Sequence, residues 1–127
     1  MPGEFEDLEV YKQAREFRKR IWKLTQILPE TEKFVLVPQM RRASLSVTNN
    51  IAEGHGSWNF RHTASYIRRS RGSMNELIDD INTCEDQKYF EKEHLEDLKN
   101  DARSVIKLLN GYIRYLRSKI KDVEKPE

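Results

Sequence analysis

Arginine is the residue type whose spacing in this chain could support chemistry. Residues 59–72 hold four arginines and no acidic residue, and residues 102–127 hold seven Lys or Arg against three acids. Between them, residues 73–101 carry ten acids against three lysines. Guanidinium groups bind phosphate through paired hydrogen bonds, so the two basic stretches could act together on a row of phosphates. The arginines of the first stretch are Arg61, Arg68, Arg69 and Arg71.

Three interpretations of this charge pattern remain open at the level of sequence. The first is a phosphate-binding surface, with Trp58, Tyr66 or Tyr115 available to stack on unpaired bases. The second is a solvated face with scattered ion pairs. The third is pairing of basic and acidic surfaces between subunits. The net charge of +2 and the pI near 8.7 do not decide among them.

Catalytic and metal-binding patterns are weak. Glu91 and His94 have the i, i+3 spacing of carboxylate-bridged di-iron bundles, but the second such pair that those sites need is missing from the sequence. The remaining histidines, His55 and His62, complete no compact ligand set, and Cys84 is the only cysteine. No serine has a His and an acid beside it on its helix. The sequence therefore predicts no enzyme, no metal, no cofactor and no small-molecule substrate.

Length and composition favour one soluble helical domain over residues 1–127. The chain has a mass of 15.1 kDa, with 37% hydrophobic and 35% charged residues and only five Gly and four Pro. No run reaches the roughly 20 apolar residues that span a bilayer. The first residues lack the basic start and apolar stretch of a signal peptide. We therefore expect a cytoplasmic protein without a membrane partner.

Four apolar stripes with alternating spacings of three and four predict four helices, over residues 7–28, 36–54, 59–87 and 92–121. Short connectors make consecutive helices antiparallel neighbours, so we expect an all-α, up-down-up-down four-helix bundle. Gly72 lies within the third helix, and close approach of a neighbouring helix is the favoured reason for it. The first two stripes are Val10, Ala14, Phe17, Ile21, Leu24 and Leu28, then Leu36, Met40, Ala43, Val47 and Ile51. The other two are Phe60, Ala64, Ile67, Met74, Ile78 and Ile81, then Leu95, Leu98, Ala102, Val105, Leu109, Tyr112, Leu116 and Ile120.

The second predicted helix is unusually polar, since residues 39–54 include five Ser, Thr or Asn. These residue types compete for backbone hydrogen bonds and disfavour helix interiors, so we expect their polar atoms to bond to neighbouring helices or to another subunit. A ridge on this helix, turned away from its apolar stripe, suits a subunit contact. A plain solvent face and a ligand site remain the alternatives. The ridge consists of Gln39, Arg42, Leu45, Ser46, Asn50 and Glu53.

Antiparallel packing sorts the charge toward the two ends of the bundle. The start of the third helix then lies beside the end of the fourth, which predicts a basic pole at one end and an acidic pole at the other. The basic pole consists of Arg61, Arg68, Arg69, Arg114, Arg117, Lys119 and Lys121. The acidic pole consists of Asp79, Asp80, Glu85, Asp86, Glu91, Glu93, Glu96 and Asp97.

Five motifs are spread along the chain: Asp7-Leu-Glu-Val-Tyr11 with Ala14, Gln39-Met-Arg-Arg-Ala43 with Ser46, Asn50-Ile-Ala-Glu-Gly54, Gly72-Ser73 with Glu76, and Leu109-Asn-Gly-Tyr-Ile-Arg114. In these motifs the chain resembles the 23S rRNA-intervening-sequence proteins, which are small bacterial four-helix bundles. The resemblance implies a ring-shaped homopentamer. The family is also similar to the accessory bundle proteins of diversity-generating retroelements, whose basic surface is thought to engage nucleic acid.

These patterns together predict a non-enzymatic, ring-like oligomer that binds RNA or DNA through a basic surface. An oligomeric scaffold that binds another protein, without nucleic acid, is the alternative. The residues predicted to contact nucleic acid are Arg61, Arg68, Arg69, Arg71, Arg114 and Arg117.

Overall fold

A computed structural model describes residues 3–57 and 59–124. The chain forms four α-helices, α1 (Glu9–Gln26), α2 (Leu36–His55), α3 (Phe60–Asp86) and α4 (Lys92–Glu124). Two single-turn 3-10 helices, η1 (Phe5–Asp7) and η2 (Glu30–Glu32), precede α1 and α2. Within the described ranges there is no strand, so the predicted all-α class with four helices is confirmed.

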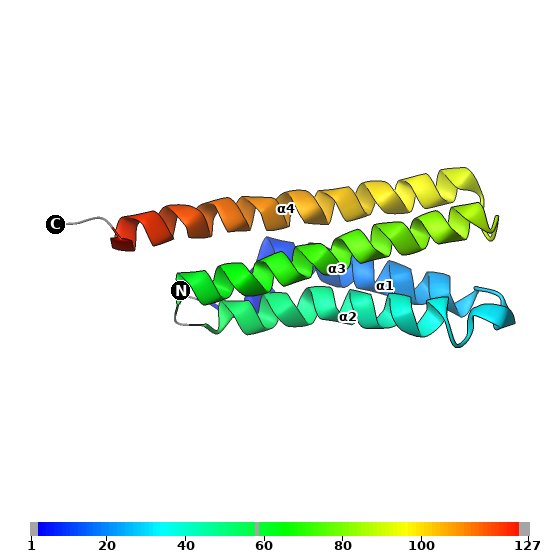
Figure 1. The fold of residues 1–127 in the computed structure, drawn as a ribbon, viewed down its shortest axis with the longest axis horizontal. Coiled ribbons are helices and arrows are strands. Elements are labelled where there is room, and N and C mark those ends of the chain that lie inside the picture. The colour runs from blue at the N-terminus through cyan, green and yellow to red at the C-terminus, as the bar shows by residue number, and fades with distance from the viewer. Residues whose placement is uncertain (1–2, 58, 125–127) are drawn as a thin grey trace.

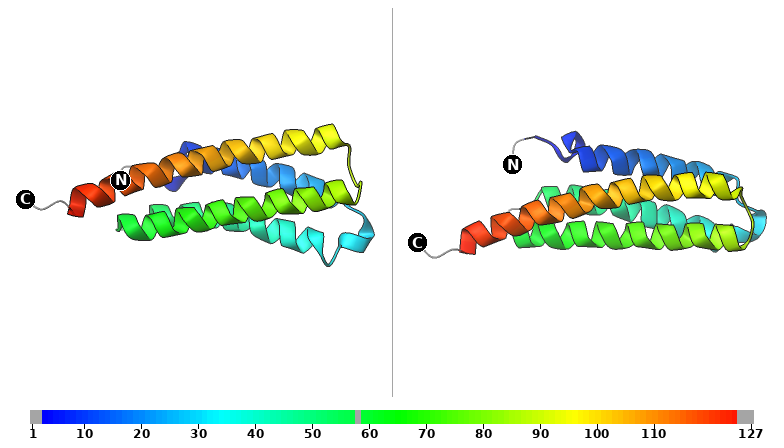
Figure 2. Two further views of the ribbon diagram at one scale, coloured as in Figure 1. Left: turned by 45° about the horizontal axis from the view of Figure 1, so that its top comes forward. Right: turned by 90° about the horizontal axis from the view of Figure 1, so that it is seen from above.

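The helices lie side by side along one long axis, and each runs in the opposite direction to the one before it (Figure 1). Helix α3 packs most extensively on α2 and α4, while α1 packs on α2 and less extensively on α4. The C-terminal turns of α4 project past the ends of α2 and α3, as both views of Figure 2 show. The prediction ended this helix at Lys121, whereas α4 continues to Glu124.

The predicted apolar stripes form the core. Every residue of the first two stripes is buried. The core includes one residue from each helix that is at most 3% exposed: Leu24, Val47, Ile81 and Leu109. Burial of this apolar surface is the dominant stabilising term for such a bundle. Cys84, expected as a small core residue, is fully buried as well. Burial raises the pKa of its thiol to about 11, so it stays protonated at neutral pH.

The inward face of α3 differs from the prediction at two residues, Phe60 and Ile78, of which Phe60 is half-buried at the start of the helix. Ile78 is only half-buried, whereas Leu77 and Cys84 are fully buried. A helix of 3.6 residues per turn drifts relative to a strict three-and-four pattern, and α3 must face both α2 and α4, so its buried face turns toward position 77. In α4 the same effect buries Ile113 and leaves Tyr112 and Ile120 half-buried.

The polar residues of α2 bond to the helices on either side, as expected. Toward α1, Trp22 Nε1 donates to Ser44 Oγ at 3.2 Å, and Arg18 Nη1 donates to Thr48 Oγ1 at 2.7 Å. Toward α3, Ser73 Oγ donates to Ser46 Oγ at 2.9 Å. The same hydroxyls also bond within α2, so the contacts with α1 and α3 give them second partners and help to offset the low helix propensity of the segment.

Both ends of α3 have specific capping residues. Asn59 is the N-cap, and its side-chain oxygen accepts from the backbone N–H of Arg61 at 2.8 Å and of His62 at 3.3 Å. After Asp86 the chain reverses at Lys88, whose φ of 58° lies in the left-handed region. The N–H of the next residue, Tyr89, then donates back to the carbonyl of Cys84 at 3.1 Å, which closes the helix end.

The close approach between helices that was expected at Gly72 lies at another glycine. A Cβ at Gly72 would have no heavy atom within 4 Å, so the expected close approach of a neighbouring helix is wrong within the described chain. The close approach lies at Gly54 instead, where a Cβ would come within 2.9 Å of Tyr66 Cβ on α3. Thr63 Oγ1 also donates to the Gly54 carbonyl at 2.9 Å. Gly54, which lies inside α2, therefore allows α2 and α3 to pack closely. Gly56 is the residue that caps α2.

We therefore expect alanine substitutions at these two glycines to have opposite signs. Gly72→Ala should stabilise the protein by up to about 1 kcal/mol, since alanine favours a helix interior and fits the open space. Gly54→Ala should destabilise it by about 1–2 kcal/mol, because the clash with a Cβ on a packed helix exceeds the propensity gain. Urea unfolding at one protein concentration measures both. Equal effects at the two positions would contradict this helix packing.

Candidate nucleic-acid interface

Contacts between α3 and α4 fix how the two basic stretches face each other. Arg71 Nη1 donates to Asn110 Oδ1 at 2.9 Å, and Arg61 forms an ion pair with Glu124. At the other end of the pair, Lys99 Nζ lies 3.5 Å from Glu85 Oε2. The start of α3 therefore lies beside the end of α4.

In this register the cations of α4 follow one stripe. Arg114, Arg117 and Lys121 lie four, seven and eleven residues after Asn110, so they share its face, the side of α4 that borders α3. On α3, Arg68 lies between Arg61 and Arg71 and within about 80° of both. Arg68 thus lies opposite the turn of α4 that carries Arg114 and Arg117.

We call this surface the arginine strip. Its one acid in the described chain is Glu124, which is already paired with Arg61. Arg71 is half-buried through its bond to Asn110, and the other five cations are exposed. Exposed guanidinium groups without carboxylate partners are free to bind an external anion. The strip consists of Arg61, Arg68, Arg71, Arg114, Arg117 and Lys121.

Arg69 is separated from the strip. It lies about 100° around the helix from Arg68, on the side of α3 that borders α2. There its guanidinium carbon lies 4.9 Å from the ring centroid of Tyr66. The structure thus brings five of the six arginines predicted to contact nucleic acid onto one surface and turns the sixth toward another.

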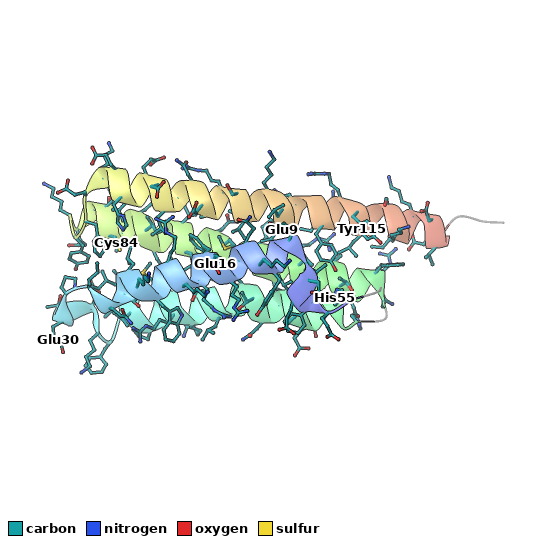
Figure 3. All side chains as sticks on the ribbon, turned by 180° about the vertical axis from the view of Figure 1, so that it is seen from behind. Glu9, Glu16, Glu30, His55, Cys84 and Tyr115 are labelled. Atoms are coloured by element: carbon teal, nitrogen blue, oxygen red, sulfur yellow. The ribbon has the colours of Figure 1, made fainter. Side chains whose placement is uncertain are left out.

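The aromatic residues predicted to stack on bases do not share one surface either. Tyr66 lies beneath Arg69, and Trp58 lies outside the described residues. Tyr115 lies on the opposite side of α4 from the strip, five residues from Asn110, with Lys119 Nζ 5.6 Å from its ring centroid. Figure 3 places Tyr115 and His55 in the same half of the bundle, with Cys84 in the other half.

An open hollow lies on the α2 side of Arg69, where α2 ends and α3 begins. Its volume is about 640 Å³, and the rings of Phe5 and Tyr66 form part of its wall. His55 belongs to this end of α2 (Figure 3), and its Nε2 lies 3.2 Å from the Gly3 carbonyl oxygen, which holds the N-terminal segment against the bundle. The residues lining the hollow are Phe5, Asn49, Ala52, Glu53, Gly56, Ser57, His62 and Tyr66.

Sequence patterns did not indicate this hollow, because three separate segments form it. Glu53 was predicted for a subunit contact, whereas Phe5, Asn49 and His62 were assigned no role in contacting a partner. The apolar and basic patterns carry no information about how η1 folds against the α2–α3 turn.

Half of the residues in the polar ridge of α2 form hydrogen bonds within the chain. Gln39 Nε2 donates to Asp80 Oδ1 at 2.6 Å, and Ser46 accepts both from Ser73 and from Asn50 Nδ2, the latter at 3.1 Å. These three ridge residues therefore lie along the boundary with α3. The remaining three, Arg42, Leu45 and Glu53, are exposed.

Asp80 is buried, although the prediction placed it in the exposed acidic pole. Only 3% of it is exposed, and its Oδ2 has no hydrogen-bond partner in the described chain. Burial raises the pKa of Asp80 to about 6, against the lowering effect of the Gln39 hydrogen bond. The charges of Asp79 and Glu76 raise it further, while Arg42 lowers it.

The rest of the acidic pole is partly paired. Glu85 pairs with Lys99, Glu96 with Arg103 at 3.2 Å, and Asp97 with Arg20 at 3.1 Å. Arg20 also pairs with Asp101, so one arginine of α1 joins two turns of α4. The other exposed members of the acidic pole, Asp79, Asp86, Glu91 and Glu93, make no ion pair in the described chain, so this end of the bundle keeps a negative charge.

The described part of the chain shows neither a group of metal ligands nor a membrane-spanning helix. Among residues 3–57 and 59–124, no three His, Cys, Asp or Glu side chains gather closely enough to hold a metal ion. None of the helices found there is long and apolar enough to cross a bilayer.

Comparison with known proteins bears on the fold. A family model described as 23S rRNA-intervening sequence protein matches residues 6–111. The chain is also similar to a solved structure, a protein of unknown function from the S23 ribosomal protein family of Bacteroides thetaiotaomicron. The two are 25% identical with a TM-score of 0.76, over 83% of this chain and 95% of that chain. No curated protein matches. The predicted resemblance is therefore confirmed.

Proposed function

This chain belongs to the 23S rRNA-intervening sequence protein family, and we propose that it works by binding nucleic acid, RNA or DNA, and not by catalysis. In this proposal the arginine strip holds the phosphate backbone. The surface lies at the basic end of an up-down bundle, and the packed core of the four helices keeps this surface rigid.

The observation that carries the proposal is the alignment of two basic stretches by the α3–α4 register. Arg71–Asn110 and Arg61–Glu124 hold the two helices so that the strip forms a row of cations with one, already paired, acid. A row of this kind matches a polyanion, since each phosphate neutralised releases bound counterions and favours association. Nothing in the strip reads base edges, so this contact gives affinity without sequence preference.

We further propose that the bundle assembles as a ring-shaped homopentamer. The outer face of α2 supports this assembly, because Leu45 is an exposed apolar residue one helical turn from the charged Arg42. A ring would carry one arginine strip per subunit and would gain avidity from simultaneous contacts. Sedimentation should then give about five times the 15.1 kDa mass of the chain.

Charge reversal on the strip tests the binding proposal. We expect the double variant Arg68→Glu/Arg114→Glu to lose affinity for single-stranded RNA by about a hundredfold at low salt, because two phosphate contacts become repulsions. Fluorescence anisotropy with a labelled RNA of about twelve nucleotides measures the affinity. Both substituted residues are exposed, so folding should be little changed.

The matched control is Lys12→Glu/Arg15→Glu, which makes the same change in net charge on exposed residues of α1. It should reduce affinity by only a few-fold. Equal losses in the two variants would show that net charge alone governs binding, which contradicts a localised strip. If neither variant affects binding, or if the wild type does not bind RNA or DNA, the scaffold alternative takes its place.

A further inference from the structure

We propose that the hollow between η1, the end of α2 and the start of α3 receives one unpaired base of the nucleic acid, with preference for guanine. This inference rests on the proposed function and adds a base-specific contact to it. The hollow lies on the other side of α3 from the arginine strip, and Arg69 lies between them at the Tyr66 ring.

The size and walls of the hollow suit a nucleobase with its sugar. Its volume of about 640 Å³ falls in the range of ligand pockets, and its openness to solvent suits a group that enters while attached to a chain. Phe5 and Tyr66 contribute aromatic rings, and Ala52 and Gly56 line the hollow without long side chains. Aromatic rings are the surfaces on which proteins stack unpaired bases.

Arg69 connects the hollow to the strip. Its guanidinium carbon lies 4.9 Å from the Tyr66 ring centroid, which keeps the charge at the rim of the hollow. Arg68, the neighbouring residue, belongs to the strip. A single strand that crosses α3 at these two residues therefore keeps its phosphates on arginine while its next base reaches the hollow.

The polar groups of the hollow favour a base that donates hydrogen bonds. Glu53 is exposed, lines the hollow and makes no hydrogen bond or ion pair in the described chain. A carboxylate accepts only, so it pairs with two adjacent donors, which guanine offers at its N1–H and its amino group. The same negative charge repels phosphate, so the base and not the backbone enters. Uracil has a single ring donor between two carbonyls and is disfavoured.

Base preference of the wild type and of Glu53→Gln tests this inference. The probes are single-stranded RNAs of about twelve uridines, with one central position occupied by guanine, adenine, cytosine or uracil. We expect the guanine probe to bind the wild type about tenfold more tightly than the uracil probe. In Glu53→Gln the preference should shrink to about twofold or less, because the amide presents one acceptor and one donor group.

The control is Glu93→Gln, which removes an exposed carboxylate at the other end of the bundle and should leave the preference at its wild-type value. Two failures can be told apart. If all four probes bind equally and Arg68→Glu/Arg114→Glu still lowers affinity by about a hundredfold, the base pocket is overturned and the proposed function stands. If no probe binds the wild type, the proposed function fails and the pocket fails with it. A guanine preference that Glu53→Gln leaves intact also overturns the pocket.

Discussion

Replacing Leu77 by alanine is expected to destabilise the bundle by about 3 kcal/mol, whereas Ile78→Ala should cost only about 1 kcal/mol. Leu77 is fully buried, so its truncation removes apolar contacts and leaves a cavity. Ile78 is half-buried at the edge of the core, so its truncation removes less buried surface and water can fill the space. Urea unfolding of both variants at one protein concentration measures the difference.

This pair of variants tests whether the residue that faces the core is the one in the structure or the one predicted from the spacing. The three-and-four spacing favoured Ile78 as the inward residue, and the structure turns α3 so that Leu77 takes that position. A larger cost at Ile78 than at Leu77 would show that α3 is rotated by about one residue from the arrangement described. Such a rotation would also move Arg68 out of the arginine strip.

Asp80→Asn is expected to stabilise the protein at pH 7 by about 2 kcal/mol. Burial raises the pKa of Asp80 to about 6, so in the folded wild type at neutral pH a buried carboxylate is charged. Asparagine is neutral and can still accept the hydrogen bond from Gln39. The gain is smaller than the full pKa difference implies, since the amide N–H₂ replaces an oxygen, Oδ2, that has no partner in the described chain.

The pH dependence of this effect has a definite sign. The folded pKa of about 6 lies above the unfolded value near 3.9, so between these pH values the folded state binds more protons than the unfolded state. The contribution of Asp80 to stability is therefore fully favourable below about pH 4 and is lost as pH rises to about 6. Unfolding free energies of the wild type and Asp80→Asn should converge at pH 4 and diverge by pH 7.

Asp79→Asn is the matched control, because Asp79 is exposed and adjacent. It should change stability by at most a few tenths of a kcal/mol at either pH. A stability difference between wild type and Asp80→Asn that is the same at pH 4 and pH 7 would contradict a raised pKa at this position. A loss of stability in Asp80→Asn at pH 7 would show that the carboxylate is better paired than its contacts indicate.

The helices and most of the core could be predicted from the sequence because a single physical rule governs them. Burial of one stripe per helix produces a three-and-four spacing, and Leu24, Val47 and Leu109 follow it in the structure. The rule does not resolve a step of one residue in a long helix, which is why Leu77 was missed. It also does not distinguish Asp79 from Asp80, since both are acidic neighbours and only the packing against α2 decides which one is buried.

The sequence predicted at which end of the bundle the arginines gather, but it did not predict which of them share one face. Antiparallel packing alone places Arg68 near Arg114, and this required no side-chain detail. Whether Arg69 shares their face depends on the rotation of α3, which the sequence pattern left open. The hollow was out of reach of the sequence, because it depends on how η1 folds against the α2–α3 turn.

The salt dependence of RNA affinity tests the central claim, that arginines from α3 and α4 bind phosphates as one surface. A plot of the logarithm of the association constant against that of salt concentration has a slope proportional to the number of phosphates neutralised. For the wild type we expect a steep slope. Arg68→Glu/Arg114→Glu should make it shallower by at least about 1.4, since each arginine lost removes about 0.7 on a single strand. The claim is contradicted if the two slopes are equal, or if Lys12→Glu/Arg15→Glu lowers the slope as much.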